Sequence, residues 1–248
     1  IVVLDRPGYR AAARVLARSL RNDPAMLSVL RGIPEAGRVR RLAGAFLALM
    51  TSGGKRVQVV GILEDARLVG AAVLYRPGTY PLPALSRLLA VGRHLLQCGA
   101  HGLSRWRQLQ AADAQHRRPE PHLRVALLGV TPEHQRQGLG AQLLQHCVDV
   151  ADRANVGVAL PSANPRHAAL YARYGFEVDA QTDAAGVGVS YLWRPVQPRS
   201  RRLEGAAARL EVAAEAAAVG QLLANSRPKA SARSAAVNNG GASRPLGA

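Results

Sequence analysis

The chain is poor in cysteine, and it has no long apolar run. Its 248 residues include only two cysteines, Cys98 and Cys147, which lie far apart and outside any cluster with metal-ligand spacing. We therefore expect two reduced thiols in the core and no metal site. No apolar stretch approaches the roughly 18 residues of a membrane span. Asp5 and Arg6 interrupt the first residues, where a secretory signal would need an apolar segment. These absences predict a soluble, cytoplasmic protein with no membrane partner.

Aromatic side chains and lysines are also scarce, although the chain carries a net charge of +17. Only Lys55 and Lys229 are lysines, and the arginines are scattered rather than gathered into runs. A nucleic-acid surface usually interleaves basic residues with aromatic side chains that stack on bases. With 4% aromatic residues the composition argues against nucleic acid as a partner. The basic surface is still suited to attracting anionic ligands.

Apolar patterning predicts alternating strands and helices up to about residue 196. A hairpin turns at Asp65, and one helix places Leu143 and Cys147 on its apolar face. The expected strands cover 1–7, 57–65, 67–77, 122–130, 156–162 and 188–196, and the expected helices cover 9–20, 35–50, 140–154 and 165–174.

The composition divides the chain into a folded domain and a tail. We place the domain at 1–198, with a helical insert at 78–120. Residues 199–248 are rich in Ala and Arg and bury little apolar surface, which predicts a short helix followed by disorder.

One glycine-containing turn, Gln135–Gly140, follows a predicted strand and opens a predicted helix. Unpaired N–H groups and the helix dipole favour an anion there, and glycine lets a phosphate approach the backbone. No GxxxxGK[ST] string is present, and Leu143 stands where a dinucleotide fingerprint needs its third glycine. A simple tight turn between strand and helix remains the alternative.

The turn does not stand alone, because a second segment accompanies it. Gln135–Gly140 matches the Q/R-x-x-G-x-G/A loop of the GCN5-related N-acetyltransferases (GNAT), and the segment 164–176, NPRHAALYARYGF, matches that family's Asn…Leu-Tyr…Gly-Phe segment. The resemblance covers roughly residues 1–195 and is closest to the puromycin N-acetyltransferase-like branch. It implies a mixed α/β (α+β) fold, with a central mixed sheet of six to seven strands whose strands 4 and 5 splay apart and with helices on its faces.

In this family acetyl-CoA lies in the gap between the splayed strands. The resemblance implies that backbone groups of Leu128 and Val130 pair with the pantetheine arm, and that the side chains of Gln135 and Arg136 lie near the phosphates. Asn164 would contact the pantetheine, although an N-cap role before Pro165 explains it equally well. The backbone N–H groups expected to hold the pyrophosphate belong to Arg136, Gln137, Gly138, Gly140 and Ala141.

Two residues are candidates for catalysis. Tyr171 corresponds to the family's tyrosine, and a phenol can protonate the departing CoA thiolate; packing in the core is the alternative for this ring. His122, at the start of strand 122–130, is the first candidate for the base that accepts the proton of the amine, and a surface histidine is the alternative.

The acceptor side departs from the family pattern. Leu123 and Arg124 stand where aromatic residues are expected, and Pro161-Ser162 replaces an acidic-and-Thr pair. Tyr75, Tyr80 and Trp106 are candidates for lining the acceptor pocket, with simple packing as the alternative.

The sequence therefore predicts an N-acetyltransferase that uses acetyl-CoA as co-substrate, no metal, and a small-molecule primary amine as acceptor. The alternatives are acetylation of a protein N-terminus or lysine, and a catalytically silent protein that binds acetyl-CoA or associates with nucleic acid. The pattern specifies no oligomeric state.

Overall fold

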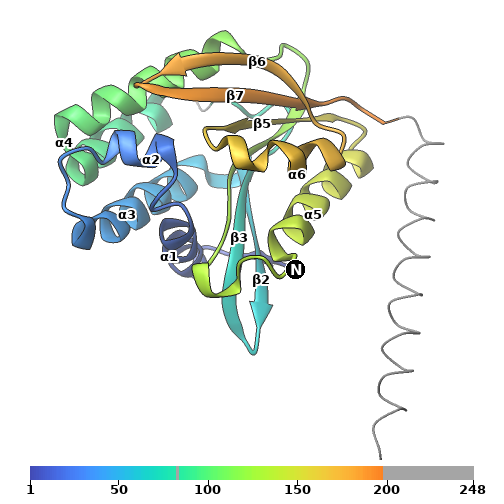
Figure 1. Ribbon diagram of the computed structural model, residues 1–248, viewed down its shortest axis with the longest axis horizontal. Helices are drawn as coiled ribbons and strands as arrows, with labels where there is room; N and C mark the ends of the chain where they lie inside the picture. Colours follow the sequence, from blue (N-terminus) through green and yellow to red (C-terminus); the bar gives the residue numbers. More distant parts are fainter. Residues whose placement is uncertain (82–83, 198–248) are drawn as a thin grey trace, which may run out of the picture. The chain divides into compact units, whose positions relative to one another are not determined.

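A seven-stranded mixed sheet organises the part of the chain that the computed structural model describes, residues 1–81 and 84–197, with the backbone alone for 84–95 (Figure 1). The spatial order is β1-β2-β3-β4-β5-β7-β6. The strands are β1 (Val2–Leu4), β2 (Val57–Glu64), β3 (Arg67–Tyr75), β4 (His122–Val130), β5 (Gly157–Ser162), β6 (Glu177–Ala184) and β7 (Val187–Arg194). The helices are α1 (Tyr9–Ser19), α2 (Pro24–Val29), α3 (Glu35–Gly53), α4 (Ala84–Gln115), α5 (Leu139–Arg153) and α6 (Ala168–Arg173).

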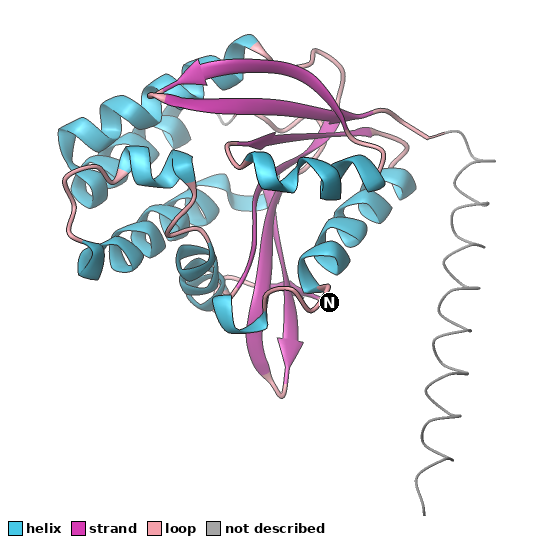
Figure 2. Ribbon diagram, viewed as in Figure 1, coloured by secondary structure: helices cyan, strands magenta, loops and turns pink. Residues whose placement is uncertain are grey.

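Helices cover both faces of the sheet (Figure 2). The helices α1 to α4 share one apolar core with β2 and β3, in which Leu16 and Phe46 are almost fully buried. On the other face α5 and α6 pack against the same strands through a second core that includes Leu143 and Cys147. Because β2 and β3 are buried on both faces, their sequences are almost continuously apolar rather than alternating.

The two parallel strands of the sheet part soon after they meet. Pairing between β4 and β5 is confined to three successive partners, beginning with His122 opposite Gly157. Beyond Arg124 the β4 strand stays bonded to β3 alone. The sheet is thus open in its middle, and one edge of β4 faces the opening.

The predicted fold class is confirmed by this mixed sheet with parallel, diverging β4 and β5 and flanking helices. Cys98 and Cys147 are both buried and unbonded. The described residues lie within one compact unit, Ile1–Pro198. The expected helix and disorder at 199–248 fall outside the described residues. Among the described helices, none has the length and apolar character needed to cross a membrane.

Two elements were not predicted from the sequence. The strand β6 is polar and largely exposed at the sheet edge, so it carries little apolar pattern. It is paired through the tight turn at Ala185 and Gly186, both of which have positive φ, as hairpin turns require. The short helix α2 lies between the two helices expected at 9–20 and 35–50; Asp23 caps it and Pro24 takes its first position.

A buried ion pair ties the last strand to the second helix layer. Arg194 donates to both carboxylate oxygens of Asp152 at 2.8 and 3.0 Å, and its Nε donates to the Tyr174 carbonyl oxygen. The side chain of Arg194 is only 7% exposed. One residue thereby joins β7 to the ends of α5 and α6, the helix that carries Tyr171.

We predict that Asp152→Ala destabilises the fold by about 3–5 kcal/mol, because it leaves a buried guanidinium without its counter-charge. Asp179→Ala is the matched control, since it removes the carboxylate of a half-exposed pair with Arg118 and should cost about 1 kcal/mol or less. Denaturant unfolding measures both changes. Equal losses in the two variants would contradict the role given to the Arg194–Asp152 pair.

Candidate functional site

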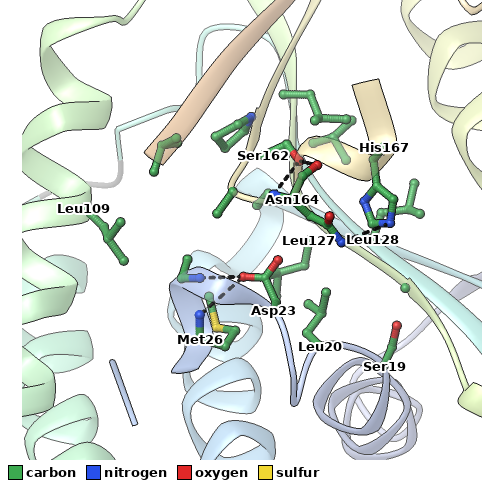
Figure 3. A pocket seen from close by; sticks show the side chains of 18 of the residues that line it. Ser19, Leu20, Asp23, Met26, Leu109, Leu127, Leu128, Ser162, Asn164 and His167 are labelled. Atoms are coloured by element: carbon green, nitrogen blue, oxygen red, sulfur yellow. Dashed lines mark hydrogen bonds between the residues drawn. The ribbon is translucent and has the colours of Figure 1, made fainter. Parts of the chain in front are cut away.

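A cavity of about 1320 Å³ lies where β4 and β5 diverge. Its walls come from the α1–α2 connection, the open part of β4, the loop before α5, the end of β5, α6 and the second half of α4. Figure 3 shows Asp23, at the start of α2, on the opposite side of this cavity from Ser162, the last residue of β5, and from Asn164, which follows that strand. Segments far apart in the sequence thus meet at one opening.

The loop before α5 presents an uncapped helix start. Gly138 is the N-cap residue with φ 81°, and no side chain caps the helix. No acidic residue occupies the first turn of α5. The first N–H groups of the helix therefore keep their hydrogen-bonding capacity and the positive end of the dipole. Such a terminus favours an anion such as a phosphate.

Side-chain contacts hold the loop before α5 in place. Gln135 donates through Nε2 to the Val130 carbonyl oxygen at 2.9 Å, and Gln137 donates to the Glu133 carbonyl oxygen at 3.4 Å. Arg18 of α1 reaches Glu133 at 2.5 Å. These contacts tie the loop to β4 and α1, so that its backbone stays open toward the cavity.

The structure leaves space in front of the loop glycines. A Cβ added at Gly138 would meet no atom within 4 Å, and one at Gly140 would come only as close as 3.9 Å to a methyl group of Val130. Of the residues predicted to bind the cofactor, six line the cavity and three, Gln137, Gly138 and Ala141, belong to the same turn without lining it. The six are Leu128, Val130, Gln135, Arg136, Gly140 and Asn164.

The backbone of β4 has free groups along the opening. The N–H of Thr131 donates to the Val69 carbonyl oxygen on β3. Because successive residues of a strand point their polar groups to opposite sides, Leu128 and Val130 point theirs toward the gap left by β5. The Val130 carbonyl oxygen already accepts from Gln135. The remaining groups can pair with an extended ligand.

Asn164 has the capping role considered for it from the sequence, and it also lies at the cavity wall; its contact with a pantetheine arm stays a prediction. Its Oδ1 accepts a hydrogen bond from the Arg166 N–H at 3.1 Å, which is an N-cap contact. The same residue lines the cavity beside Ser162 (Figure 3). Capping therefore fixes this side chain at the cavity wall.

Tyr171 lies on α6 and lines the cavity, with its side chain mostly buried. Burial raises the pKa of its phenol; a hydrogen bond with Ser162 opposes that shift, and the nearby Asp23 charge adds to it. The ring is held edge-on by His167 and Phe176. A protonated, oriented phenol at the cavity wall is suited to donate a hydrogen bond or a proton.

His122 lies outside this cavity. Its Nδ1 is 2.7 Å from the Glu120 carbonyl oxygen, and its ring meets Trp193 edge-on at 5.7 Å. His122 therefore lies at the end of β4 that is paired with β5, away from Tyr171. This placement gives no support to the predicted role as a base.

Asp23 is a cavity residue that was not predicted from the sequence. Its Oδ1 accepts from the N–H groups of Ala25 and Met26 at 3.0 and 3.3 Å, and the carboxylate lines the cavity. Burial raises its pKa; the two N–H groups and the charge of His167 oppose that shift. Figure 3 shows the carboxylate turned toward the cavity. The Asp23-Pro24 pair could have indicated this position, because Asp followed by Pro is typical of a helix start.

The far end of the cavity is aromatic and charged. Tyr75, Tyr80 and Trp106, the three predicted candidates for the acceptor pocket, all line it. Asp113 is buried there; it accepts from the Tyr80 hydroxyl at 2.6 Å and pairs with Arg124 at 2.6 Å. Arg124, read from the sequence as a departure from the expected aromatic, is thus part of a buried network. Nothing in the sequence indicated a buried role for Asp113, since it is a single acidic residue within a helical pattern.

Comparison with known proteins agrees with this geometry. Residues 107–178 match the family model of the acetyltransferase (GNAT) domain. A solved structure described as histone acetyltransferase HPA2 and related acetyltransferase, from Corynebacterium glutamicum, is 19% identical with a TM-score of 0.61, over 80% of this chain and 97% of that chain.

Two insect enzymes have the same fold. Arylalkylamine N-acetyltransferase 2 from Aedes aegypti is 11% identical with a TM-score of 0.58, over 79% of this chain and 98% of that one. The polyamine N-acetyltransferase from Drosophila melanogaster is 17% identical with a TM-score of 0.52, over 78% and 99%. The resemblance to the GNAT family is confirmed by the matched domain and by this shared fold. The likeness to the puromycin-related branch stays a prediction.

We predict that Asp23→Asn raises the melting temperature at pH 7. Because the folded-state pKa of Asp23 is raised, its ionised form weakens the fold, and this loss grows as pH rises above the ordinary range of an aspartate. The asparagine keeps the cap without the buried charge. The gain should shrink as pH falls toward 4, because the carboxyl becomes protonated first in the folded state and then also in the unfolded state.

Thermal melts at pH 7 and pH 4 test this, with Asp183→Asn as the control because Asp183 is exposed. A destabilised Asp23→Asn variant at pH 7 would show that the two N–H bonds to the carboxylate outweigh its burial.

Proposed function

We propose that this protein transfers the acetyl group of acetyl-CoA to a primary amine of a small molecule, by direct attack within a ternary complex. One observation carries the proposal: a single cavity joins an uncapped helix start, the open edge of β4 and the hydroxyl of Tyr171 to a separate aromatic end. Two substrates that react directly need such a continuous space, with one site for each.

The residues at one end fit acetyl-CoA. The start of α5 offers backbone donors and room for a pyrophosphate, with Arg136 at the cavity wall. Leu128 and Val130 offer backbone groups to the amide-containing arm, as a third strand would. Acetyl-CoA, when bound, would supply an activated acetyl group and a thiolate leaving group. The chain's own contribution is to orient this group toward the far end of the cavity.

Tyr171 is proposed as the general acid. Its raised pKa keeps the phenol protonated at neutral pH, so that the hydroxyl can donate to the sulfur as negative charge develops there. The Ser162 hydroxyl lies close enough to Tyr171 to lower the pKa of its phenol, against the larger effect of burial. Arg194 and Asp152 hold the end of α6 that follows Tyr171, through the carbonyl oxygen of Tyr174.

Asp23 is proposed to receive the proton of the attacking amine, in place of His122. The Asp23 carboxylate lines the cavity, and its charge raises the pKa of Tyr171. His122 lies outside the cavity. A raised pKa makes a carboxylate a stronger base near neutral pH. A negative charge there also attracts the ammonium form of the substrate before the proton is lost.

A small acceptor is favoured by the helical insert. The second half of α4 contributes Trp106, Leu109 and Asp113 to the cavity, so the acceptor end is walled by the insert. A protein N-terminus or lysine would have to reach past these side chains. Location in the cytoplasm stays a prediction.

We predict that Gly140→Glu weakens acetyl-CoA binding by about a hundredfold or more, because a carboxylate would face the pyrophosphate at a cost of several kcal/mol. Gly140→Ala is the control, since its Cβ would make only an ordinary contact with Val130. Calorimetry on variants with unchanged circular dichroism measures both. An unaltered affinity in Gly140→Glu would remove the phosphate role from this loop.

We predict that Tyr171→Phe lowers kcat by about 10²–10⁴-fold while the dissociation constant of acetyl-CoA changes by a few-fold at most. The phenylalanine keeps the ring and loses only the hydroxyl, which matters in the transition state. Tyr174→Phe is the control, because this neighbouring ring is absent from the cavity wall.

Steady-state thiol release over a broad amine panel, together with calorimetry, distinguishes the outcomes. A Tyr171→Phe variant as active as the wild type would mean that water, not Tyr171, serves as the acid. A wild-type protein that binds acetyl-CoA and acetylates no amine would favour the silent-binder alternative.

A further inference from the structure

The acceptor end of the cavity holds more positive than negative charge. Asp113 is 5% exposed. Its Oδ2 accepts from the Tyr80 hydroxyl, whereas its Oδ1 forms an ion pair with Arg124 at 2.6 Å but has no hydrogen-bond partner among the described residues. The Arg124 guanidinium also lies over the Tyr80 ring, 4.7 Å from its centroid. This one carboxylate therefore balances this one guanidinium.

Arg117 adds a second guanidinium to the same group. It follows α4, lines the cavity, and lies over the Tyr80 ring at 4.9 Å. Its Nε is buried and has no hydrogen-bond partner among the described residues. A buried donor without an acceptor costs about 1–3 kcal/mol, and more when it is charged. Arg117, Arg124 and Asp113 together carry one uncompensated positive charge.

The other carboxylate that lines the cavity, Asp23, lies at the start of α2 and is bonded there to backbone N–H groups rather than to the arginines. The pKa of Tyr171 is raised mainly by burial, and the negative charge of Asp23 raises it further. Asp113 instead acts on Tyr80 and Tyr191, where burial is again the main cause and raises each pKa to about 12. The two acidic groups thus mark two separate places, one beside the proposed acid and one beside the arginines. Asp23 suits the amine of an acceptor, and Arg117 suits a group of opposite sign.

We propose that the natural acceptor carries a carboxylate as well as its primary amine, and that Arg117 binds this carboxylate. The inference rests on the proposed acetyl transfer and names the class of acceptor for that same site. One carboxylate matches the single missing negative charge, and a guanidinium binds it through charge-assisted hydrogen bonds. Amino acids and related amino-carboxylates belong to this class, whereas simple amines leave the Arg117 Nε without an acceptor.

The test compares amino acids with the amines that they give on decarboxylation. Lysine, ornithine and 6-aminohexanoate, whose terminal amines lie several bonds from the carboxylate, are assayed beside cadaverine, putrescine and pentylamine, with acetyl-CoA and thiol release as the readout. We expect kcat/KM for the acid to exceed that for the matched amine by about tenfold or more in at least one pair, because hydrogen bonds to charged groups contribute roughly that much. Equal or better use of the amine in every pair would overturn the inference while leaving acetyl transfer intact.

Variants assign the preference to Arg117. Arg117→Gln should lower the ratio of acid to amine by about tenfold or more, and Arg117→Lys should retain part of it. Arg14→Gln removes the same charge from an exposed position outside the cavity and should leave the ratio unchanged. An acid preference that survives in Arg117→Gln would overturn the assignment.

A binding measurement separates failure of this inference from failure of acetyl transfer. If no acceptor in the panel releases thiol, the proposed function fails for these substrates. Calorimetry of the same six compounds with the CoA-saturated protein then decides the inference. Tighter binding of an acid than of its amine, lost in Arg117→Gln, supports the carboxylate site, and its absence overturns it.

Discussion

The separation of β4 from β5 is the constraint on which the rest of the structure depends. A parallel pair normally continues for the length of its strands, yet here it ends after three partners. The edge of β4 at Leu128 and Val130 is free because β5 diverges from it. The same divergence places the end of β5, with Ser162 and the following Asn164, at the wall of the cavity, while β5 stays paired with β7. One interruption in backbone pairing thus produces both the opening and the side chains that face it.

The separation is stable because each side of it is anchored elsewhere. On the β4 side, antiparallel bonds to β3 and the Gln135 brace hold the strand and its loop. On the β5 side, β7 pairs along the strand, and Arg194 joins β7 to the ends of α5 and α6. Close packing of β4 against α1 also contributes. Gly129 of β4 lies so near Ser19 that a Cβ added at Gly129 would clash with the Ser19 Oγ. That close approach sets the end of α1, and therefore the position of Asp23.

The sequence predicted the half of the site that is built from backbone, and missed much of the half built from side chains. Gln135–Gly140 is local and its glycines have few alternatives, so a short pattern was enough for the loop and for the divergent sheet. The acceptor end is assembled from single residues on four segments, and Asp113 or Arg117 alone resembles any helix-surface charge. His122 was selected by its place in a strand, whereas its surroundings depend on Trp193, 71 positions further along the chain. Strand β6 was missed for a related reason, since a polar edge strand is stabilised by its partner β7 rather than by its own burial.

Polar groups in this cavity are held in positions that weaken the folded protein. Asp23 keeps its place through two backbone N–H bonds although burial raises its pKa, and the buried Nε of Arg117 has no acceptor in the part of the chain that the structure describes. Neither arrangement contributes to the stability of the fold, because a neutral cap or an apolar side chain would remove the penalty. Both penalties would be relieved by one ligand with an ammonium group at Asp23 and a carboxylate at Arg117. The same two charges also fix the ligand's direction, because reversing it would bring like charges together at both ends. Only one orientation then places the amine on the side of Tyr171, where acetyl transfer is proposed to occur.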